Sequence, residues 1–198
     1  MKDQYSLLTP WYSSLVRLMF GDQLKKSKLC LLGNTRAKKI LIIGGGDGMD
    51  YQEIAADISG EYWELSASML KKARVNLRQS NLDFHLGYFN TEEGKQFDEI
   101  WLHFLLDTMT DESIHILLQE LSIALRKDGT LQFVDFFPST NLFQAFVTRV
   151  MITFFQLFTG HQRKNLPNYE MIFADEKWVK KEQMKLMGGW VKAQIWTL

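Results

Sequence analysis

The sequence feature that most constrains the fold is residues 39–50, KILIIGGGDGMD, an apolar run that ends abruptly in glycines. Residues 40–43 show no polar alternation, which is typical of a parallel strand covered on both faces. The glycines that follow permit a tight turn and the close approach of a ligand. Apolar residues then recur at helical spacing, and Asp47 is placed to cap the first turn. The stretch therefore predicts a buried strand that turns into a helix.

An acidic residue follows at a distance that suits a nucleoside site. Glu64 ends a second predicted strand, residues 61–64, and lies about twenty residues after Gly44. A carboxylate at that place can accept hydrogen bonds from both hydroxyls of a ribose. A dinucleotide fingerprint would want a further glycine where this chain has Met49, so NAD is disfavoured. The two features together predict a different nucleoside-containing ligand.

At these residues the sequence resembles the class I S-adenosylmethionine-dependent methyltransferases. The resemblance covers nearly the whole chain, through ILIIGGGDG, YWELSASMLKKAR, FDEIWLHFLLDTMTDES and LSIALRKDGTLQFVDF in that order. It implies a three-layer, doubly wound α/β fold of the Rossmann-like kind. The expected sheet has seven strands and is mostly parallel, with an antiparallel last strand and an N-terminal helical cover. The implied reaction is in-line transfer of a methyl group from S-adenosylmethionine to a small molecule, with S-adenosylhomocysteine as product.

The resemblance also implies a set of cofactor contacts near the carboxyl ends of the strands. Two positions depart from the pattern of the family, because Ile42 and Tyr88 stand where acidic residues are usual. Asp47 or Asp50 could replace the first acid, and Phe89 could stack on the adenine. The predicted cofactor-binding residues are Gly44, Gly45, Gly46, Asp47, Glu64, Leu65, Met69, Tyr88, Phe89, His103 and Phe104.

The last residue of the predicted fourth strand, residues 97–103, and a residue shortly after it are candidates for catalysis. In an open parallel sheet, ligands bind beyond the carboxyl ends near the point where the strand order reverses, between the first and fourth strands. His103 and Asp107 would lie there and could take a proton from an acceptor that must lose one. Each has a structural alternative, since His103 could be a core histidine and Asp107 could cap a turn. The other three histidines lie at unrelated spacings and predict no metal site.

The chain is expected to form a single domain, in which residues 1–36 are the N-terminal cover and residues 37–198 the core. The spacing of apolar residues predicts the remaining helices and strands. Residues 10–32 are expected to form one or two helices over the edge of the sheet, and Tyr5, Trp11 and Tyr12 are candidates to wall the pocket. Further predicted elements are a helix capped by Ser66, a strand over 83–86, a helix capped by Asp111 and running to 126, a strand over 130–136, a short helix in 166–175 and strands over 178–187 and 190–198. Gly129 is expected to be left-handed, and Gly188-Gly189 to turn a hairpin, although a helix over 177–187 is the alternative.

Residues 142–158 form the most hydrophobic segment of the chain. Arg149 near its middle and Gln144 and Gln156 near its ends argue against a transmembrane helix. One interpretation is a helix buried against the sheet. The other is a helix whose Phe-rich face lines an apolar substrate pocket or contacts a membrane surface peripherally. The second interpretation would favour an apolar acceptor such as a lipid or a quinone precursor.

Composition excludes several classes of protein. The 198 residues suit one domain, and basic and acidic residues balance at 23 each, which predicts no nucleic-acid partner. The single cysteine, Cys30, excludes an internal disulfide. The first residues lack the apolar core of a secretory signal, so a cytoplasmic location is expected. The sequence does not set the oligomeric state.

Two other functions compete with methyl transfer. The apolar or aromatic residues at the two acidic positions would suit a non-catalytic methyltransferase-like module used for binding or as a scaffold. The first motif also resembles that of the aminopropyltransferases, such as spermidine synthase. Their aspartate-rich signatures are replaced here by Leu102-His103-Phe104-Leu105 and Gly87-Tyr88, which disfavours the second alternative.

Overall fold

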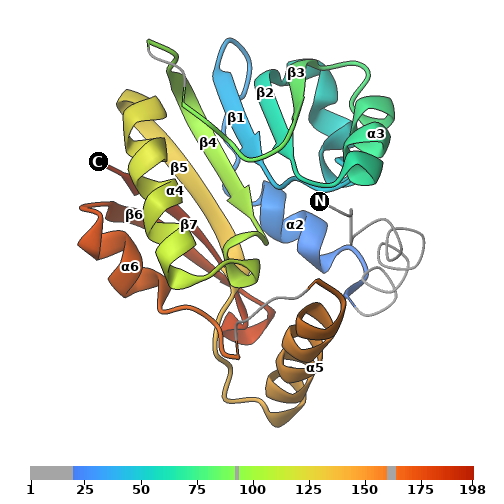
Figure 1. Ribbon diagram of the computed structural model, residues 1–198, viewed down its shortest axis with the longest axis vertical. Coiled ribbons are helices and arrows are strands. Elements are labelled where there is room, and N and C mark those ends of the chain that lie inside the picture. The colour runs from blue at the N-terminus through green and yellow to red at the C-terminus, as the bar shows by residue number, and fades with distance from the viewer. Residues whose placement is uncertain (1–19, 92–93, 160–163) are drawn as a thin grey trace.

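The strands of the protein form one mixed sheet (Figure 1). The computed structural model describes residues 20–91, 94–159 and 164–198. Within them the strands are β1 (Lys39–Ile43), β2 (Ser59–Glu64), β3 (Asn81–Leu86), β4 (Phe97–His103), β5 (Leu125–Phe136), β6 (Val179–Leu186) and β7 (Val191–Thr197). Their order is β3-β2-β1-β4-β5-β7-β6, and β7 pairs antiparallel with both β5 and β6, whereas the other pairs are parallel. The predicted seven-stranded, mostly parallel sheet with an antiparallel last strand is confirmed.

Helices cover both faces of this sheet. They are α2 (Gln23–Leu29), η1 (Met49–Asp57), α3 (Ala67–Asn76), η2 (Leu106–Thr108), α4 (Asp111–Ala124), α5 (Leu142–Thr159), α6 (Tyr169–Asp175) and η3 (Met187–Gly189). Ile40 and Ile42 of β1 face the core shared with η1 and α3, whereas Leu41 and Ile43 face the core shared with α4 and α6. Figure 1 shows α4 and α6 in front of the sheet. β1 is therefore covered on both faces, which explains its lack of polar alternation.

The predicted N-terminal cover is only partly within the described residues. α2 contributes Leu29, which packs with Leu32 against the core beneath η1. Tyr5, Trp11 and Tyr12 lie outside the described residues. The single-domain division at residue 36 thus stays a prediction.

The helix after the glycine turn begins differently from the prediction. Its N-cap is Gly48 at φ 70°, not Asp47, and the helix is a 3₁₀ helix. The left-handed conformation of Gly48 turns the chain by its backbone, so no side chain caps the helix. Asp47 instead accepts a hydrogen bond at Oδ1 from the Met49 amide, at 3.2 Å. The prediction that Asp47 is the cap was wrong.

The region around α4 also departs from the prediction at both ends. Thr110, not Asp111, is the N-cap, and its Oγ1 accepts a hydrogen bond from the Ser113 amide at 3.2 Å. The helix ends at Ala124, and β5 begins at Leu125 with an irregular register to β4. The left-handed residue of this segment is Asp128 at φ 67°, not Gly129, because a short acidic side chain tolerates that conformation.

The C-terminal hairpin is confirmed. β6 and β7 pair antiparallel on either side of Gly188 and Gly189, whose φ values are 69° and 92°. A helix over residues 177–187 is excluded. β6 forms one edge of the sheet, and its side chains from Val179 to Lys185 are all exposed.

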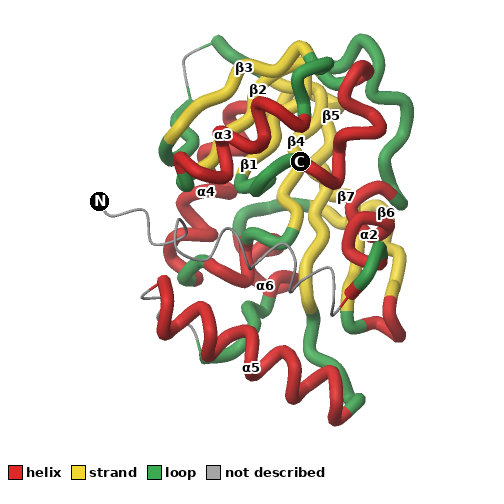
Figure 2. Tube along the Cα trace, turned by 90° about the vertical axis from the view of Figure 1, so that its right-hand side faces the viewer, coloured by secondary structure: helices red, strands yellow, loops and turns green. Residues whose placement is uncertain are grey.

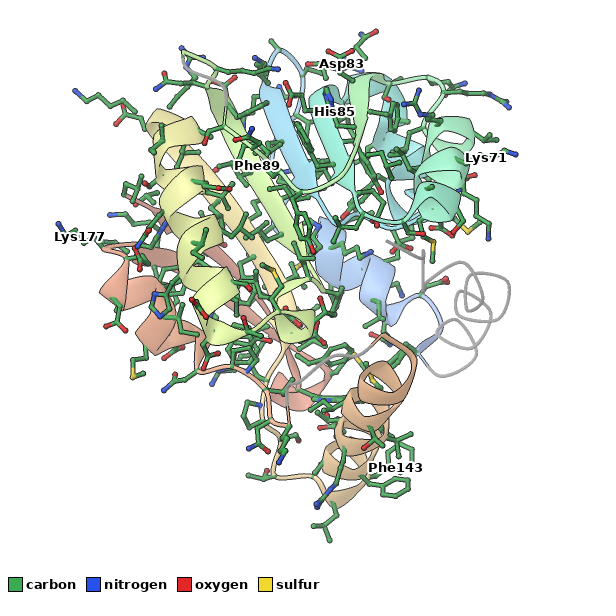
Figure 3. All side chains as sticks on the ribbon, viewed as in Figure 1. Lys71, Asp83, His85, Phe89, Phe143 and Lys177 are labelled. Atoms are coloured by element: carbon green, nitrogen blue, oxygen red, sulfur yellow. The ribbon has the colours of Figure 1, made fainter. Side chains whose placement is uncertain are left out.

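α5 is not the buried helix of the first interpretation. In Figures 1 and 2 it lies at one end of the long axis of the molecule, below the sheet. Val147 is 5% exposed, but Phe143 is 71% and Phe146 65% exposed, and Figure 3 shows Phe143 on the outer side of the helix. Gln144 Nε2 donates to the Met187 carbonyl at 3.1 Å, so one side of α5 packs on the hairpin. None of the helices in the described part of the chain is both long and apolar enough to span a membrane.

Candidate active site

The glycine turn joins the carboxyl ends of β1 and β2. The Gly44 amide donates to the Trp63 carbonyl at 2.8 Å, and the Gly46 amide donates to Glu64 Oε2 at 3.0 Å. Gly46 has φ 69°, and a Cβ built on it would meet no atom of the described residues within 4 Å. The backbone beside Gly46 therefore faces open space. The Tyr62 hydroxyl of β2 donates to the Gly46 carbonyl at 2.9 Å and so fixes the turn to the sheet.

Glu64 is held between this turn and the next helix. Its Oε1 accepts a hydrogen bond from the Ser66 amide at 2.9 Å, while its Oε2 accepts the Gly46 amide. Ser66 in turn caps α3, because its Oγ accepts the Met69 amide at 3.4 Å. The sequence predicted the Ser66 cap, and the structure confirms it. The carboxylate of Glu64 is thus fixed next to the open space at Gly46.

Exposed apolar side chains follow β2 and β3 at the same edge of the sheet. Leu65 is 44% and Tyr88 70% exposed, and the Gly87 amide joins the two strand ends by donating to the Glu64 carbonyl at 3.1 Å. Phe89 and Met69 are each 7% exposed, and Phe89 meets Trp63 edge-on with ring centroids 5.6 Å apart. The predicted cofactor residues on this side therefore divide into two exposed side chains and two that pack mainly inside.

His103 ends β4 and is almost fully enclosed, with 2% of its surface exposed. Its Nδ1 lies 2.9 Å from the Tyr51 hydroxyl, and its ring stacks on Trp101 with centroids 5.8 Å apart. Burial, and secondarily the nearby ammonium of Lys28, lower the pKa of His103 well below its ordinary value. The described residues offer no hydrogen-bond partner to its Nε2. His103 is thus a neutral, enclosed side chain.

Asp107 lies in η2, just after β4, and is partly exposed. Its backbone amide donates to Asp135 Oδ2 at 3.2 Å, and Asp135 Oδ1 accepts the Phe136 amide at 2.8 Å. Asp135 is fully buried at the end of β5, and this burial, followed by the charge of Asp107, raises its pKa well above the ordinary value. The buried carboxyl group therefore ties the turn that carries Asp107 to the sheet.

A third charged group reaches this edge from the N-terminal helix. Lys28 of α2 forms an ion pair with Asp50 of η1 at 2.7 Å. Its ammonium lies 5.4 Å from the ring centroid of Tyr51 and 5.8 Å from that of Phe104. Phe104 follows β4 directly and has φ 55°. The structure thus brings the predicted residues His103 and Phe104 together with a lysine that sequence reasoning did not select.

Sequence reasoning missed Lys28, Tyr51 and Asp135. The sequence does contain a signal for Asp135. It is an acid near the end of the mostly apolar run 131–137, Leu-Gln-Phe-Val-Asp-Phe-Phe, in which Gln132 is the other polar residue. A carboxyl group in a buried strand needs hydrogen-bond partners. Tyr51 looked like one more apolar position of a helix, and Lys28 like an ordinary surface lysine.

Comparisons with known proteins show the fold. No family model and no curated protein matches the sequence. Among solved structures, a putative methyltransferase from Haloferax volcanii, in complex with the methyltransferase activator Trm112, matches with TM-score 0.75 and 14% identity over 100% of this chain and 98% of that chain. DhpI, in complex with S-adenosylhomocysteine (SAH), matches with TM-score 0.69 and 14% identity over 99% of this chain and 95% of that one.

A third solved structure is longer than this chain. The O-methyltransferase family 2 protein from Planctomyces limnophilus, in complex with apigenin, matches with TM-score 0.70 and 15% identity. The match covers 99% of this chain but 62% of that protein. At these identities the comparisons establish the class I methyltransferase fold, and the chemistry is argued from the site itself.

Proposed function

We propose that this protein transfers the methyl group of S-adenosylmethionine to a small molecule. The observation that carries the proposal is the carboxylate of Glu64, held 3.0 Å from the Gly46 amide beside open space at the carboxyl edge of the sheet. Such a carboxylate suits the two hydroxyls of a ribose, and the glycine turn lets the ligand approach the backbone. DhpI and a second solved structure of similar fold, CalO1 (TM-score 0.67, 14% identity over 94% of this chain and 56% of that chain), are both described with bound SAH and support the choice of cofactor.

The exposed side chains beyond β2 and β3 suit the adenine. We assign Leu65 and Tyr88 to it, because both offer apolar surface to solvent at the strand ends next to Glu64. An aromatic ring can stack on a purine in place of the usual hydrogen bond that the adenine amino group donates to an acid. Phe89, at 7% exposed, has less surface to offer.

The chemistry requires little from the protein beyond positioning. The bound cofactor supplies a methyl group that its sulfonium already makes electrophilic. Side chains that hold the acceptor in line contribute up to roughly 7–11 kcal/mol through orientation. We assign the removal of a proton from a hydroxyl acceptor to Asp107, because the residue is partly exposed, with one carboxylate oxygen, Oδ1, buried, and because its turn is fixed by Asp135. His103 is enclosed and bonded to Tyr51, which makes it a poorer base.

The aromatic rings at the ends of β4 and β5 support an apolar acceptor. Phe104 packs against Phe136 with ring centroids 5.1 Å apart, next to the side of α5 that carries Val147 and Met151. The Planctomyces limnophilus protein of the same fold is described in complex with apigenin, which supports a small organic acceptor.

One observation favours a non-catalytic module as the second candidate. Ile42, which replaces the usual acid of the first strand, is 1% exposed and packs in the core beneath η1. No carboxylate at that position is available to the cofactor, so its affinity depends more heavily on Glu64.

Calorimetric titration with SAH, and separately with NADH, tests the proposal. The wild type is expected to bind SAH and not NADH, and Glu64→Ala is expected to weaken binding about tenfold or more, because charge-assisted hydrogen bonds are lost. Glu170→Ala is the matched control, since Glu170 is also an ion-paired acid, 2.7 Å from Lys180, but lies outside the site. Folded wild type that binds neither ligand would favour the non-catalytic module.

A further inference from the structure

α5 exposes a strip of large apolar side chains on its outer side. Four residues at helical spacing, each between 48% and 87% exposed, define this apolar strip: Leu142, Phe143, Phe146 and Val150. The inner side of the helix packs on the protein, because Val147 and Met151 belong to the hydrophobic cluster that also contains Phe136 and Trp190. The apolar strip is therefore a fixed feature of the surface, on a helix that is held in place from its other side.

A hydrogen bond adds to this attachment. The Trp190 indole donates to Thr148 Oγ1 at 2.8 Å, and Gln144 donates to the Met187 carbonyl. The polar side chains of the first half of α5 thus point to the hairpin, while the large apolar ones of the strip face solvent. Soluble proteins rarely expose such groups together without a use for them, which marks the strip as an interaction surface.

The segment that contains α5 carries only positive charge. Residues 136–169 include Arg149, Arg163 and Lys164 but neither aspartate nor glutamate, so all 23 acidic residues of the chain lie outside this segment. Arg149 is exposed and lies on the same side of the helix as the strip, one turn after Phe146. The partner of this surface is therefore expected to be apolar and negatively charged.

α5 also lies where a flat surface can reach it. Figures 1 and 2 place the helix at the lower end of the long axis, and Figure 3 shows Phe143 on its outer side, near the tip. An extended flat surface can thus contact the apolar strip without meeting the helices on the two faces of the sheet.

An anionic bilayer matches this combination. On a helix that lies in a membrane interface, apolar side chains enter the boundary between headgroups and acyl chains, and arginine or lysine side chains attract acidic lipids. A second copy of the chain fits less well. A stable protein interface takes roughly 20–30 residues a side, and two copies of this segment would bring their positive charges together.

We propose that α5 docks this protein on the surface of a membrane that contains anionic lipids, with the apolar strip inserted and Arg149 at the headgroups. The docking does not depend on the proposed function. It has a consequence for that function, because β1 and β4 point their carboxyl ends toward the end of the molecule where α5 lies (Figure 1). Docking would thus turn the candidate site toward the bilayer, where an apolar acceptor dissolves, and this consequence rests on the proposed function.

Co-sedimentation with lipid vesicles tests the docking. The wild type is expected to bind vesicles of equal parts phosphatidylcholine and phosphatidylglycerol, and to bind vesicles of phosphatidylcholine alone more weakly. Phe143→Ser/Phe146→Ser is expected to lower the vesicle affinity about tenfold or more, because two aromatic rings no longer enter the bilayer. Arg149→Gln is expected to lower it about fivefold, for the anionic vesicles only.

Ile116→Ser/Ile123→Ser is the matched control. These two residues are 53% and 67% exposed on α4, a helix that carries acidic residues and neither lysine nor arginine. The control is expected to bind vesicles as the wild type does. All these variants are expected to keep the wild-type affinity for SAH, so failure of the docking and failure of the proposed function appear with different ligands.

Two results would overturn the docking. One is wild-type vesicle affinity of Phe143→Ser/Phe146→Ser, and the other is a wild type that stays in the supernatant with both kinds of vesicle. If sedimentation equilibrium then showed a dimer that Phe143→Ser/Phe146→Ser converts to a monomer, the apolar strip would belong to a contact between two copies of this chain.

Discussion

The two halves of the candidate site are built by different means. On the side that we assign to the ribose, called the ribose side, backbone amides of Gly46 and Ser66 hold the carboxylate of Glu64, so this acid is fixed by residues next to the glycine turn and the α3 cap. On the reaction side, groups from distant segments meet, since Asp135 of β5 holds the turn of Asp107. The ribose side is thus a product of local backbone geometry, whereas the reaction side depends on tertiary burial of charge.

This difference has a consequence for mutagenesis. Changes on the ribose side should alter cofactor affinity, because they disturb a preformed backbone site. Changes on the reaction side should alter the rate of methyl transfer or the pH dependence of stability, and they should leave cofactor affinity intact.

The largest effect is expected from Asp107→Asn. If Asp107 takes the proton of a hydroxyl acceptor, kcat should fall by roughly 10²- to 10⁴-fold. Calorimetric affinity for SAH should stay at the wild-type value. Transfer of a labelled methyl group to an acceptor found by screening small apolar compounds measures the rate. Asp111→Asn, at an exposed acid in the first turn of α4, is the control. A rate close to wild type would remove Asp107 from the mechanism.

An intermediate effect is expected from Gly46→Ala on the ribose side. The left-handed φ of 69° strains any residue with a Cβ by about 1–2 kcal/mol, and the new methyl group would enter the open space that we assign to the ligand. Affinity for SAH should fall by about tenfold. Gly33→Ala, where a Cβ also meets no atom of the described residues within 4 Å and φ is not left-handed, should bind as the wild type does. Equal affinities of the two variants would show that the ligand lies elsewhere.

The smallest effect is expected from Asp135→Asn, in the pH dependence of stability. Because burial raises the pKa of Asp135 above 3.8, the stability linked to its proton is complete below that pH and is lost as the pH rises through the folded-state pKa. Asparagine cannot ionise, so the stability of the variant does not fall with rising pH for this reason. The midpoint of thermal unfolding of the variant, minus that of the wild type, should increase between about pH 5 and about pH 8. A constant difference would mean that Asp135 is already ionised when folded.

The same difference explains what the sequence could predict. The bounds of β4, the Ser66 cap and the glycine hairpin all follow from patterns within a few residues, and the structure reproduces them. Glu64 was selected because its spacing from the glycine turn is a local signal. The carboxyl ends of neighbouring parallel strands then bring such residues to one edge without further information.

Local sequence patterns could not predict which groups surround a side chain after folding. His103 and Asp107 are close in sequence, yet one is enclosed against Tyr51 and the other is partly exposed. Lys28 contacts Asp50 and lies near the rings of Tyr51 and Phe104 because α2 packs on η1, which the local sequence does not indicate. The exposure of Phe143 on α5 was equally out of reach, because a hydrophobic helix has the same pattern whether other elements cover it or not.

The exposed edge strand β6 bears on the behaviour of the protein at high concentration. An uncovered sheet edge offers free backbone groups to which a strand of another molecule can add, and this is a common route to aggregation. Lys180, Lys181 and Lys185 are exposed along β6. Lys180 is ion-paired with Glu170 and Glu182 lies between these lysines, so the protection comes mainly from the cost of desolvating the charges on intermolecular pairing. Replacing them with threonine would keep the strand but remove this protection against fibre-like association.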